Sequence, residues 1–207
     1  MSPKGARDLA ADFSEHAGTL LPGRGMLVAG VSGGADSLAL LHLLATVWPA
    51  DPARLVAVHV HHGLRGRAAD ADRAAVETAC AGLGVRCECV RVPVRERARR
   101  EGRSLEEAGR LARQEAFLAA ARRHRAGAVL LGHHQDDQAE TLLLNLLRGA
   151  GGRGLGGLRP VRPFPHPEAP RGLRLVRPLL PYSRRALRAY LAKRKLAWRE
   201  DASNADV

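Results

Sequence analysis

Residues 32–37 have the sequence SGGADS, which combines the residue types that bind a phosphate group. Glycines allow backbone N–H groups to approach an anion closely, and a helix that begins at such a turn adds partial positive charge. Ser32 and Ser37 can add hydroxyl donors, whereas the Asp36 carboxylate would repel phosphates unless a Mg²⁺ ion lay between them. No Gly-Lys-Ser/Thr follows, so the segment is not a Walker A loop. The alternative is a tight strand-to-helix turn without a ligand.

A second polar cluster, HHQDDQAET at residues 133–141, contains groups suited to proton transfer or metal binding. Asp137 and Glu140 are three residues apart at the start of an expected helix, so their carboxylates share one face. They could bind an amine and accept its proton, or hold a second Mg²⁺, and the sequence leaves both open. His133 ends the preceding strand and could contact a nucleotide or a substrate. Asp136 is a candidate helix cap.

These clusters need a scaffold, and the chain alternates apolar runs with helical stretches. Strands are expected at 26–31, 55–60, 85–92, 128–132 and 173–180, and helices at 36–48, 68–82, 104–123, 137–148 and 183–196. Ser104 and Ser183 suit helix N-caps, Ser104 as part of a capping box with Glu107. Apolar strands separated by helices predict an α/β fold with a parallel, doubly wound sheet of about five strands.

Polar clusters follow three of the expected strands. Besides residues 32–37 and 133–141, the segment HHGLRGR at 61–67 follows the second strand. Ligands bind beyond the carboxyl ends of the strands in sheets of this kind, so the three segments predict one active site. Only one histidine of each adjacent pair is expected to face the cleft, because successive side chains of an extended segment point to opposite sides.

Charge is distributed unevenly along the chain. The net charge is +12, and residues 148–199 contain 14 Lys or Arg against one acid, Glu168. Residues 1–147 hold 19 bases and 17 acids. An Arg-rich composition alone would not explain the loss of acids, so the basic segment indicates a nucleic-acid partner. We therefore divide the chain into a core at 1–147 and a glycine-rich loop and basic, RNA-facing part of the same catalytic domain at 148–207.

Several classes of protein are disfavoured by composition. No apolar run reaches the roughly 18 residues of a membrane span, and the N-terminus has no apolar signal segment. We therefore expect a cytoplasmic protein without a membrane partner. Cys80, Cys87 and Cys89 are an odd number and contain no C-x-x-C pair, so we expect small buried thiols instead of a disulfide framework.

Residues 26–37 resemble the PP-loop, with its S-G-G-x-D-S signature, of the N-type ATP pyrophosphatases. That superfamily includes GMP synthetase, asparagine synthetase, NAD synthetase and several tRNA-modifying enzymes. The resemblance implies that ATP is cleaved between its α- and β-phosphates. A carbonyl oxygen of the substrate is adenylated, pyrophosphate is released, and a nucleophile then displaces AMP.

Further segments resemble the tRNA(Ile)-lysidine synthetase family, in matching order over about residues 24–204. They lie at 59–65, 110–113, 132–141, 148–157, 177–180 and 200–204. The resemblance implies ligation of L-lysine to carbon 2 of the wobble cytidine of tRNA(Ile) with the CAU anticodon, using ATP and Mg²⁺. The resemblance also favours a homodimer. Such enzymes usually continue with an Arg-Asn segment and further tRNA-binding domains, so we expect this chain to be a minimal form or a fragment.

On this resemblance, particular residues receive expected roles. We expect ATP contacts from Ser32, Gly33, Gly34, Ala35, Asp36, Ser37, His59, Arg113, Gly132 and His133. We expect catalytic roles for Asp36, Arg113, His133, Asp137 and Glu140, with Asp36 and Asp137 as Mg²⁺ ligands. The loop at 148–157 is expected to order over ATP or the cytidine; a passive linker is the alternative.

Three other functions remain as alternatives. A tRNA-thiolating enzyme of the same superfamily is associated with S-G-G-K-D-S and C-x-x-C pairs, whereas this chain has Ala35 in the loop and no C-x-x-C. A ligase or amidotransferase for free nucleotides would not need the basic segment. A non-catalytic nucleotide- or RNA-binding module would not need Asp36, Arg113, Asp137 and Glu140 together.

Overall fold

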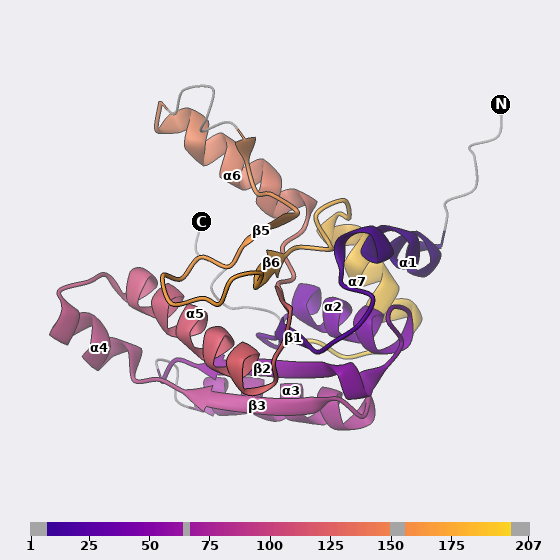
Figure 1. Cartoon of the computed structure of the whole chain (residues 1–207), viewed down its shortest axis with the longest axis horizontal. Coiled ribbons are helices and arrows are strands. Elements are labelled where there is room, and N and C mark those ends of the chain that lie inside the picture. Colours follow the sequence, from indigo (N-terminus) through magenta and orange to yellow (C-terminus); the bar gives the residue numbers. More distant parts are fainter. Residues whose placement is uncertain (1–7, 64–66, 150–155, 200–207) are drawn as a thin grey trace.

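A computed structural model describes residues 8–63, 67–149 and 156–199 of the chain. The described strands form one six-stranded sheet in the order β3-β2-β1-β4-β6-β5 (Figure 1). They are β1 (Leu27–Gly30), β2 (Leu55–His61), β3 (Arg86–Arg91), β4 (Ala128–Leu130), β5 (Val161–Pro163) and β6 (Arg174–Val176). All neighbouring pairs are parallel except β5 and β6, which are antiparallel. The α/β fold with a mainly parallel sheet is confirmed, with β5 as an additional edge strand where no element was expected.

Helices cover both faces of this sheet. They are α1 (Leu9–Leu20), α2 (Ala35–Thr46), α3 (Arg67–Gly82), α4 (Val94–Glu101), α5 (Leu105–Arg123), α6 (Gln135–Leu147) and α7 (Arg184–Lys193), with a short 3₁₀ helix η1 (Pro52–Arg54). Side chains from α1, α2, α3 and α7 share one core cluster, and α5 packs in a second cluster with the other sheet face. No helix was expected from the sequence at α1 or α4.

Burial on two sides explains the composition of the central strands. Every residue of β1 and β2 is buried, and both strands read as nearly continuous apolar runs. This is the expected pattern for parallel strands between two helical layers. Chain order reverses between β1 and β4, because β2 and β3 extend to one side of β1 while β4 and β6 extend to the other. A crevice for ligands is therefore expected beyond the carboxyl ends of β1 and β4.

The helix caps differ in part from those expected. Ser183 Oγ accepts a hydrogen bond from the Ala186 N–H at 3.3 Å, and Ser104 Oγ accepts one from the Glu107 N–H at 3.1 Å. The Glu107 carboxylate pairs with Arg103 at 2.5 Å, so it does not complete the expected capping box.

The cysteines also differ from expectation. Cys80 is buried, but Cys87 is half-buried and Cys89 is exposed, so the expectation of buried thiols is wrong for the edge strand β3. An edge strand has one neighbour instead of two, which leaves more of its side chains in contact with solvent.

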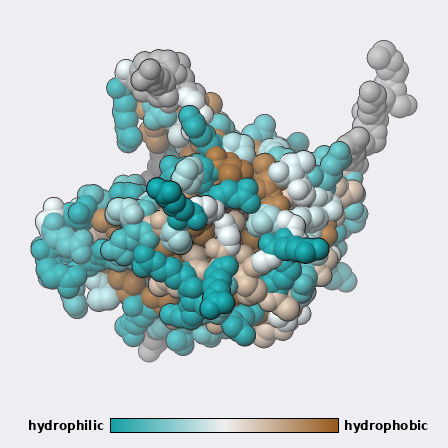
Figure 2. Space-filling view, viewed as in Figure 1, coloured by the Kyte–Doolittle hydropathy of each residue, from teal (hydrophilic) through white to brown (hydrophobic). Residues whose placement is uncertain are grey.

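Helix α6 projects from the body of the molecule (Figure 1). Its outer face is apolar, with Leu143, Leu144, Leu146 and Leu147 exposed by 60%, 40%, 56% and 84%. The space-filling view shows apolar residues below this projection as well (Figure 2). Among the described residues, no helix is both long enough and apolar enough to cross a membrane.

Parts of three expected segments lie outside the described residues. They are most of the glycine-rich loop at 148–157, residues 64–65 after the second strand, and the acidic end at 200–204. Their expected roles remain predictions from the sequence.

Candidate active site

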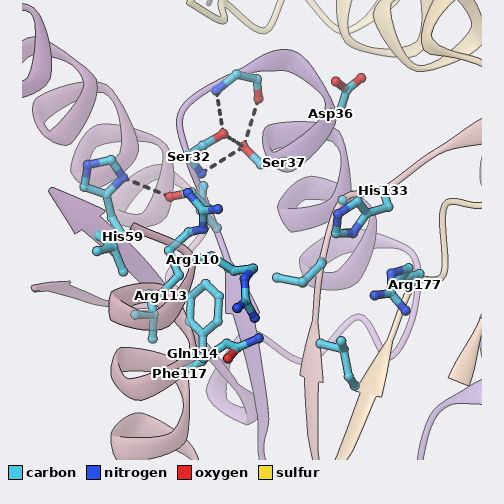
Figure 3. Close-up of a pocket in the computed structure, with 18 of the residues that line it drawn as sticks. Ser32, Asp36, Ser37, His59, Arg110, Arg113, Gln114, Phe117, His133 and Arg177 are labelled. Carbon is cyan, nitrogen blue, oxygen red and sulfur yellow. Dashed lines mark hydrogen bonds between the residues drawn. The ribbon is translucent and has the colours of Figure 1, made fainter. Parts of the chain in front are cut away.

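A pocket of about 750 Å³ opens at the carboxyl ends of β1, β2 and β4 (Figure 3). All three polar clusters contribute to its wall, which confirms that they converge. The lining includes Ser32, Gly34, Asp36, Ser37, His59, His61, His62, Arg110, Arg113, Gly132, His133 and Asp137. Three expected site residues, Gly33, Ala35 and Glu140, do not line this pocket.

The loop at 32–37 is organised by its two serines. Ser37 Oγ accepts hydrogen bonds from the N–H groups of Ser32 at 3.1 Å and Gly33 at 3.3 Å, and donates one to the Gly34 carbonyl at 3.0 Å. Ser32 Oγ accepts the Gly34 N–H at 3.3 Å. Gly33 has φ = +100°, a conformation that a side chain would disfavour. Helix α2 begins directly after Gly34, so backbone donors and a helix N-terminus meet where a phosphate would bind.

Asp36 lies in the first turn of α2 and lines the pocket. Its Oδ1 is buried and has no hydrogen-bond partner among the described residues. An unpartnered carboxylate oxygen beside a phosphate-binding loop fits a divalent cation, because Mg²⁺ is commonly held by one or two carboxylates together with substrate phosphates. Asp137 also lines the pocket, but its Oδ2 accepts the His134 N–H at 2.8 Å.

His134 takes part in the site although no role was expected for it from the sequence. It begins α6, and its Nδ1 accepts the Asp137 N–H at 3.4 Å, which completes a reciprocal capping box with Asp137. Asp136 is therefore not the cap of α6; its Oδ2 accepts the Arg184 N–H at 2.8 Å. Burial of His134 favours its neutral form, but the Asp36 and Asp137 carboxylates outweigh burial and raise the pKa of the ring.

His133 faces the pocket, whereas His134 does not line it. Burial, followed by the positive charge of Arg177, lowers the pKa of His133 to about 4, so its ring is neutral at neutral pH. Its Nδ1 is buried without a partner among the described residues, which leaves it available to a ligand. Gly132 allows the segment after β4 to approach α2 closely, because a Cβ at this position would lie 3.1 Å from the Asp36 carbonyl oxygen.

The histidines after β2 behave differently from the pair at 133–134. His61 and His62 both line the pocket, so the expectation that only one faces it is wrong here. The chain leaves the strand at His61, which ends the regular alternation of side chains. His59 Nδ1 lies 2.9 Å from the Val31 carbonyl oxygen, and this contact orients the ring at the pocket wall.

Arginines from α5 form another part of the wall. Arg113 and Arg110 are one helical turn apart and both line the pocket. Arg113 Nη1 lies 3.4 Å from His62 Nε2. Burial, followed by the charge of Arg113, lowers the pKa of His62 to about 4, so the neutral ring does not add charge beside the guanidinium. Arg113 thus brings a positive charge to the same pocket as the phosphate loop.

Glu140 lies one turn beyond Asp137 on α6. Of these two carboxylates, only Asp137 lines the pocket. Arg162 and Arg177 line the pocket although no role was expected for them. Arg162 lies on β5, where no strand was expected, and Arg177 was noted only as part of the segment 177–180 that resembles the family. The three-residue strands β5 and β6 are too short to show alternation, so the excess of basic residues in 148–199 was the available signal for both arginines.

Comparisons with known proteins agree with this architecture. Residues 6–207 match the family model described as a PP-loop domain. The tRNA(Ile)-lysidine synthase of Alkalilimnicola ehrlichii is 47% identical over 94% of this chain and 41% of that protein. The corresponding protein of Geobacter sulfurreducens is 43% identical over 94% and 39%. This chain thus spans about two fifths of the length of these curated relatives.

Solved structures resemble the fold at low sequence identity. The U34-tRNA thiolase NcsA from Methanococcus maripaludis, solved with its [4Fe-4S] cluster, has a TM-score of 0.70 at 20% identity, over 92% of this chain and 65% of that one. The NH3-dependent NAD synthetase from Campylobacter jejuni has a TM-score of 0.55 at 15% identity, over 90% and 70%. Together with the phosphate loop at the end of β1, the match over nearly the whole chain shows that this protein belongs to the PP-loop domain family.

Proposed function

We propose that this chain is the catalytic PP-loop part of a tRNA(Ile)-lysidine synthetase. It would ligate lysine to carbon 2 of the wobble cytidine of tRNA(Ile) with the CAU anticodon, giving lysidine, AMP and pyrophosphate. The observation that carries the proposal is the pocket in which the phosphate loop, Arg113 and Asp137 meet. Curated relatives named tRNA(Ile)-lysidine synthase, 36–47% identical over most of this chain, support the choice of substrate.

The first step is adenylation of the cytidine. O2 of the base attacks the α-phosphorus of ATP, the bond to the bridging oxygen breaks, and pyrophosphate leaves. The loop at 32–37 would hold the departing pyrophosphate, and Arg113 would stabilise charge on the α-phosphate in the transition state. Asp36 would hold a Mg²⁺ ion, which would neutralise part of the phosphate charge.

The second step is attack by the lysine ε-amine on carbon 2. The C–N bond forms, the bond from carbon 2 to the AMP-bearing oxygen breaks, and one proton leaves the nitrogen. Asp137 is the pocket carboxylate that can accept this proton, and Glu140, one turn further along α6, is our candidate for binding the approaching ammonium group. His133, neutral and unpartnered at Nδ1 among the described residues, is our candidate for a hydrogen bond to the nucleotide.

The thiolase alternative requires ligands that are not assembled here. NcsA was solved with a [4Fe-4S] cluster, whereas this sequence has no C-x-x-C pair. The residues that the structure describes contain no group of three or more His, Cys, Asp or Glu arranged to hold a metal ion. We therefore favour ligation of an amine. Because the proposed reaction uses tRNA and ATP, we expect the protein to act in the cytoplasm.

We also propose that two copies of the chain associate through α6. Its exposed face carries four leucines, while the more polar side with Gln138 and Thr141 is half-buried. In an antiparallel pair, the exposed leucines of one helix would pack against the same leucines of the other, so the surface is self-complementary. Light scattering should show a dimer that Leu143→Glu with Leu147→Glu converts to a monomer. Leu105→Glu, an exposed leucine elsewhere, is the control, and a monomeric wild type would contradict the pairing.

The function is tested by incorporation of labelled lysine. The chain is incubated with ATP, Mg²⁺ and transcripts of tRNA(Ile) carrying either the CAU or the GAU anticodon. We expect label only in the CAU transcript, with AMP and pyrophosphate formed in equal amounts. Label in the GAU transcript, or sulfur transfer in place of lysine, would overturn the assignment.

A further inference from the structure

Two arginines form the wall of the pocket opposite β2. Arg162 lies on β5 and Arg177 directly follows β6, and both line the pocket. Figure 3 shows Arg177 beside His133, on the other side of the pocket from His59. The strand order places this wall beyond β4, whereas the phosphate loop follows β1. Arg162 and Arg177 are thus separate from the groups assigned to the ATP phosphates.

The antiparallel pairing brings the two side chains to the same face. Arg162 pairs with Leu175, which also lines the pocket, and Arg177 follows Leu175 by two residues. Residues two apart on an extended segment point to the same side, so Arg162 and Arg177 are diagonal neighbours. Long side chains at such positions are within reach of one another.

Neither arginine has a carboxylate partner among the residues that the structure describes. Arg177 is only 4% exposed, and its Nη1 donates to the Arg159 carbonyl oxygen at 2.9 Å. The Nε atoms of both Arg162 and Arg177 are buried without a hydrogen-bond partner in the described part of the chain. Burial and the charge of Arg162 lower the pKa of Arg177 to about 10, which leaves it positively charged at neutral pH.

Two adjacent positive charges, one of them buried, are unfavourable unless an anion binds between them. A guanidinium presents paired N–H donors that match the oxygens of a phosphate or a carboxylate. The β5–β6 hairpin also carries Arg159 and Arg171 on its exposed surface, within the segment 148–199 that contains 14 bases and one acid. Because the two arginines adjoin this basic surface, we expect their ligand to be a phosphate of a polyanion backbone and not the carboxylate of a small molecule.

We propose that Arg162 and Arg177 form a subsite that binds a backbone phosphate of the RNA substrate, next to the nucleotide whose base enters the pocket. The inference rests on the proposed function for the identity of the substrate. The subsite fixes the position of the RNA strand, while the phosphate loop, Asp36 and Arg113 act on ATP. Arg162 and Arg177 are therefore RNA-positioning residues.

The test measures binding of an RNA hairpin with the sequence of the CAU anticodon stem and loop, by fluorescence anisotropy over a range of salt concentrations. Arg162→Gln and Arg177→Gln should each weaken binding about ten-fold and reduce the slope of log affinity against log salt by about one. Arg99→Gln, which removes an exposed arginine of α4 outside both the pocket and the basic segment 148–199, is the matched control and should change affinity by less than about two-fold.

Two further arms identify the source of the anion. ATP affinity should be unchanged in both variants, and so should the KM for lysine. A loss of ATP affinity, or a raised KM for lysine with normal RNA binding, would overturn the proposal because the arginines would then hold a nucleotide phosphate or the lysine carboxylate. Unchanged RNA binding in both variants, or no binding by the wild type, would also overturn it.

The variants must remain folded for this comparison. Thermal unfolding is measured for each, and Arg162→Gln, at a half-buried position, carries the test if Arg177→Gln unfolds. Arg177→Lys keeps the charge but loses the paired donors, so it should recover only part of the affinity. RNA binding requires no turnover, so normal binding without lysine incorporation would refute the proposed function and leave the subsite standing.

Discussion

His134 Nε2 lies 3.3 Å from Asp36 Oδ2, so the ring that begins α6 also contacts the carboxylate in the first turn of α2. Arg184 Nε also lies 3.3 Å from this nitrogen. Through Asp36, Asp137 and Arg184, the buried ring of His134 thereby contacts residues of three helices, α2, α6 and α7. It orients Asp36 while leaving the other carboxylate oxygen, Oδ1, free to face a cation.

Replacement of His134 should affect both folding and catalysis. His134→Ala removes the cap of α6 and the contact to Asp36, and we expect a loss of about 1–2 kcal/mol in the free energy of unfolding. The rate of pyrophosphate release should fall by more than the fraction of unfolded protein accounts for, because Asp36 loses its orientation. His134→Asn keeps a capping side chain and should recover stability but not the rate. Recovery of both by Asn would show that His134 acts only as a cap.

The same residue predicts a dependence of stability on pH. The pKa of His134 is raised in the folded state, so its protonation stabilises the fold fully below the unfolded value of 6.5. This contribution is lost as the pH rises through the higher folded pKa. Urea unfolding between pH 6 and 9 should therefore show a decline in the wild type that His134→Asn lacks. Parallel curves for the two proteins would contradict the raised pKa.

His133 should have the opposite effect at acid pH. Its pKa is lowered to about 4, so the unfolded state takes up a proton before the folded state does. The folded state is thus destabilised as the pH falls from 6.5 towards 4, by up to about 3 kcal/mol. His133→Gln should lose less stability than the wild type over this range, measured by urea unfolding. An equal loss in both proteins would show that His133 is not held in its neutral form.

Asp36 is predicted to be required for cleavage of ATP. Asp36→Asn keeps the shape of the side chain but removes the charge that would hold Mg²⁺, so we expect AMP formation to fall by at least about 10³-fold. Asp51→Asn, an exposed carboxylate that caps the short helix η1, is the control and should retain activity. Near-normal AMP formation by Asp36→Asn would exclude a role for this carboxylate in binding the cation.

Arg113 is predicted to act on the α-phosphate in the transition state. Arg113→Gln should lower kcat for pyrophosphate release about 100-fold while changing ATP affinity by only a few-fold, because the added charge at the α-phosphate develops during the reaction. Arg99→Gln on the exposed surface of α4 should leave both quantities unchanged. A loss of ATP affinity without a change in kcat would indicate that Arg113 binds the ground state instead.

Much of the fold could be predicted from the sequence because buried parallel strands leave a strong pattern. The apolar runs at β1, β2 and β4 and the polar segments that follow them predicted the edge at which the pocket lies. Strand β5 was missed because three residues ending in a proline do not show alternation. The pairing of β5 with β6 joins residues that are distant in the sequence. The position of Arg162 depends on this pairing, so it could not be predicted either.

The positions of individual side chains were less predictable. His134 was missed as the cap because Ser, Thr, Asp and Asn are the usual capping residues, and Asp136 was the nearest of these. Glu140 shares a helix face with Asp137, but packing against the body sets the rotation of α6 and leaves Glu140 outside the pocket. Helical spacing predicts that two residues share one face of a helix, but it does not predict whether that face lines the pocket.

The most direct test of the central claim is a measurement of stoichiometry on a single RNA. Labelled lysine incorporated into tRNA(Ile) with the CAU anticodon is compared with the AMP formed from ATP over the same time course, and the modified base is identified by mass spectrometry. We expect one lysine per AMP, with the added mass on the wobble cytidine. AMP formation without lysine on that cytidine, or lysine attached at another position, would contradict it.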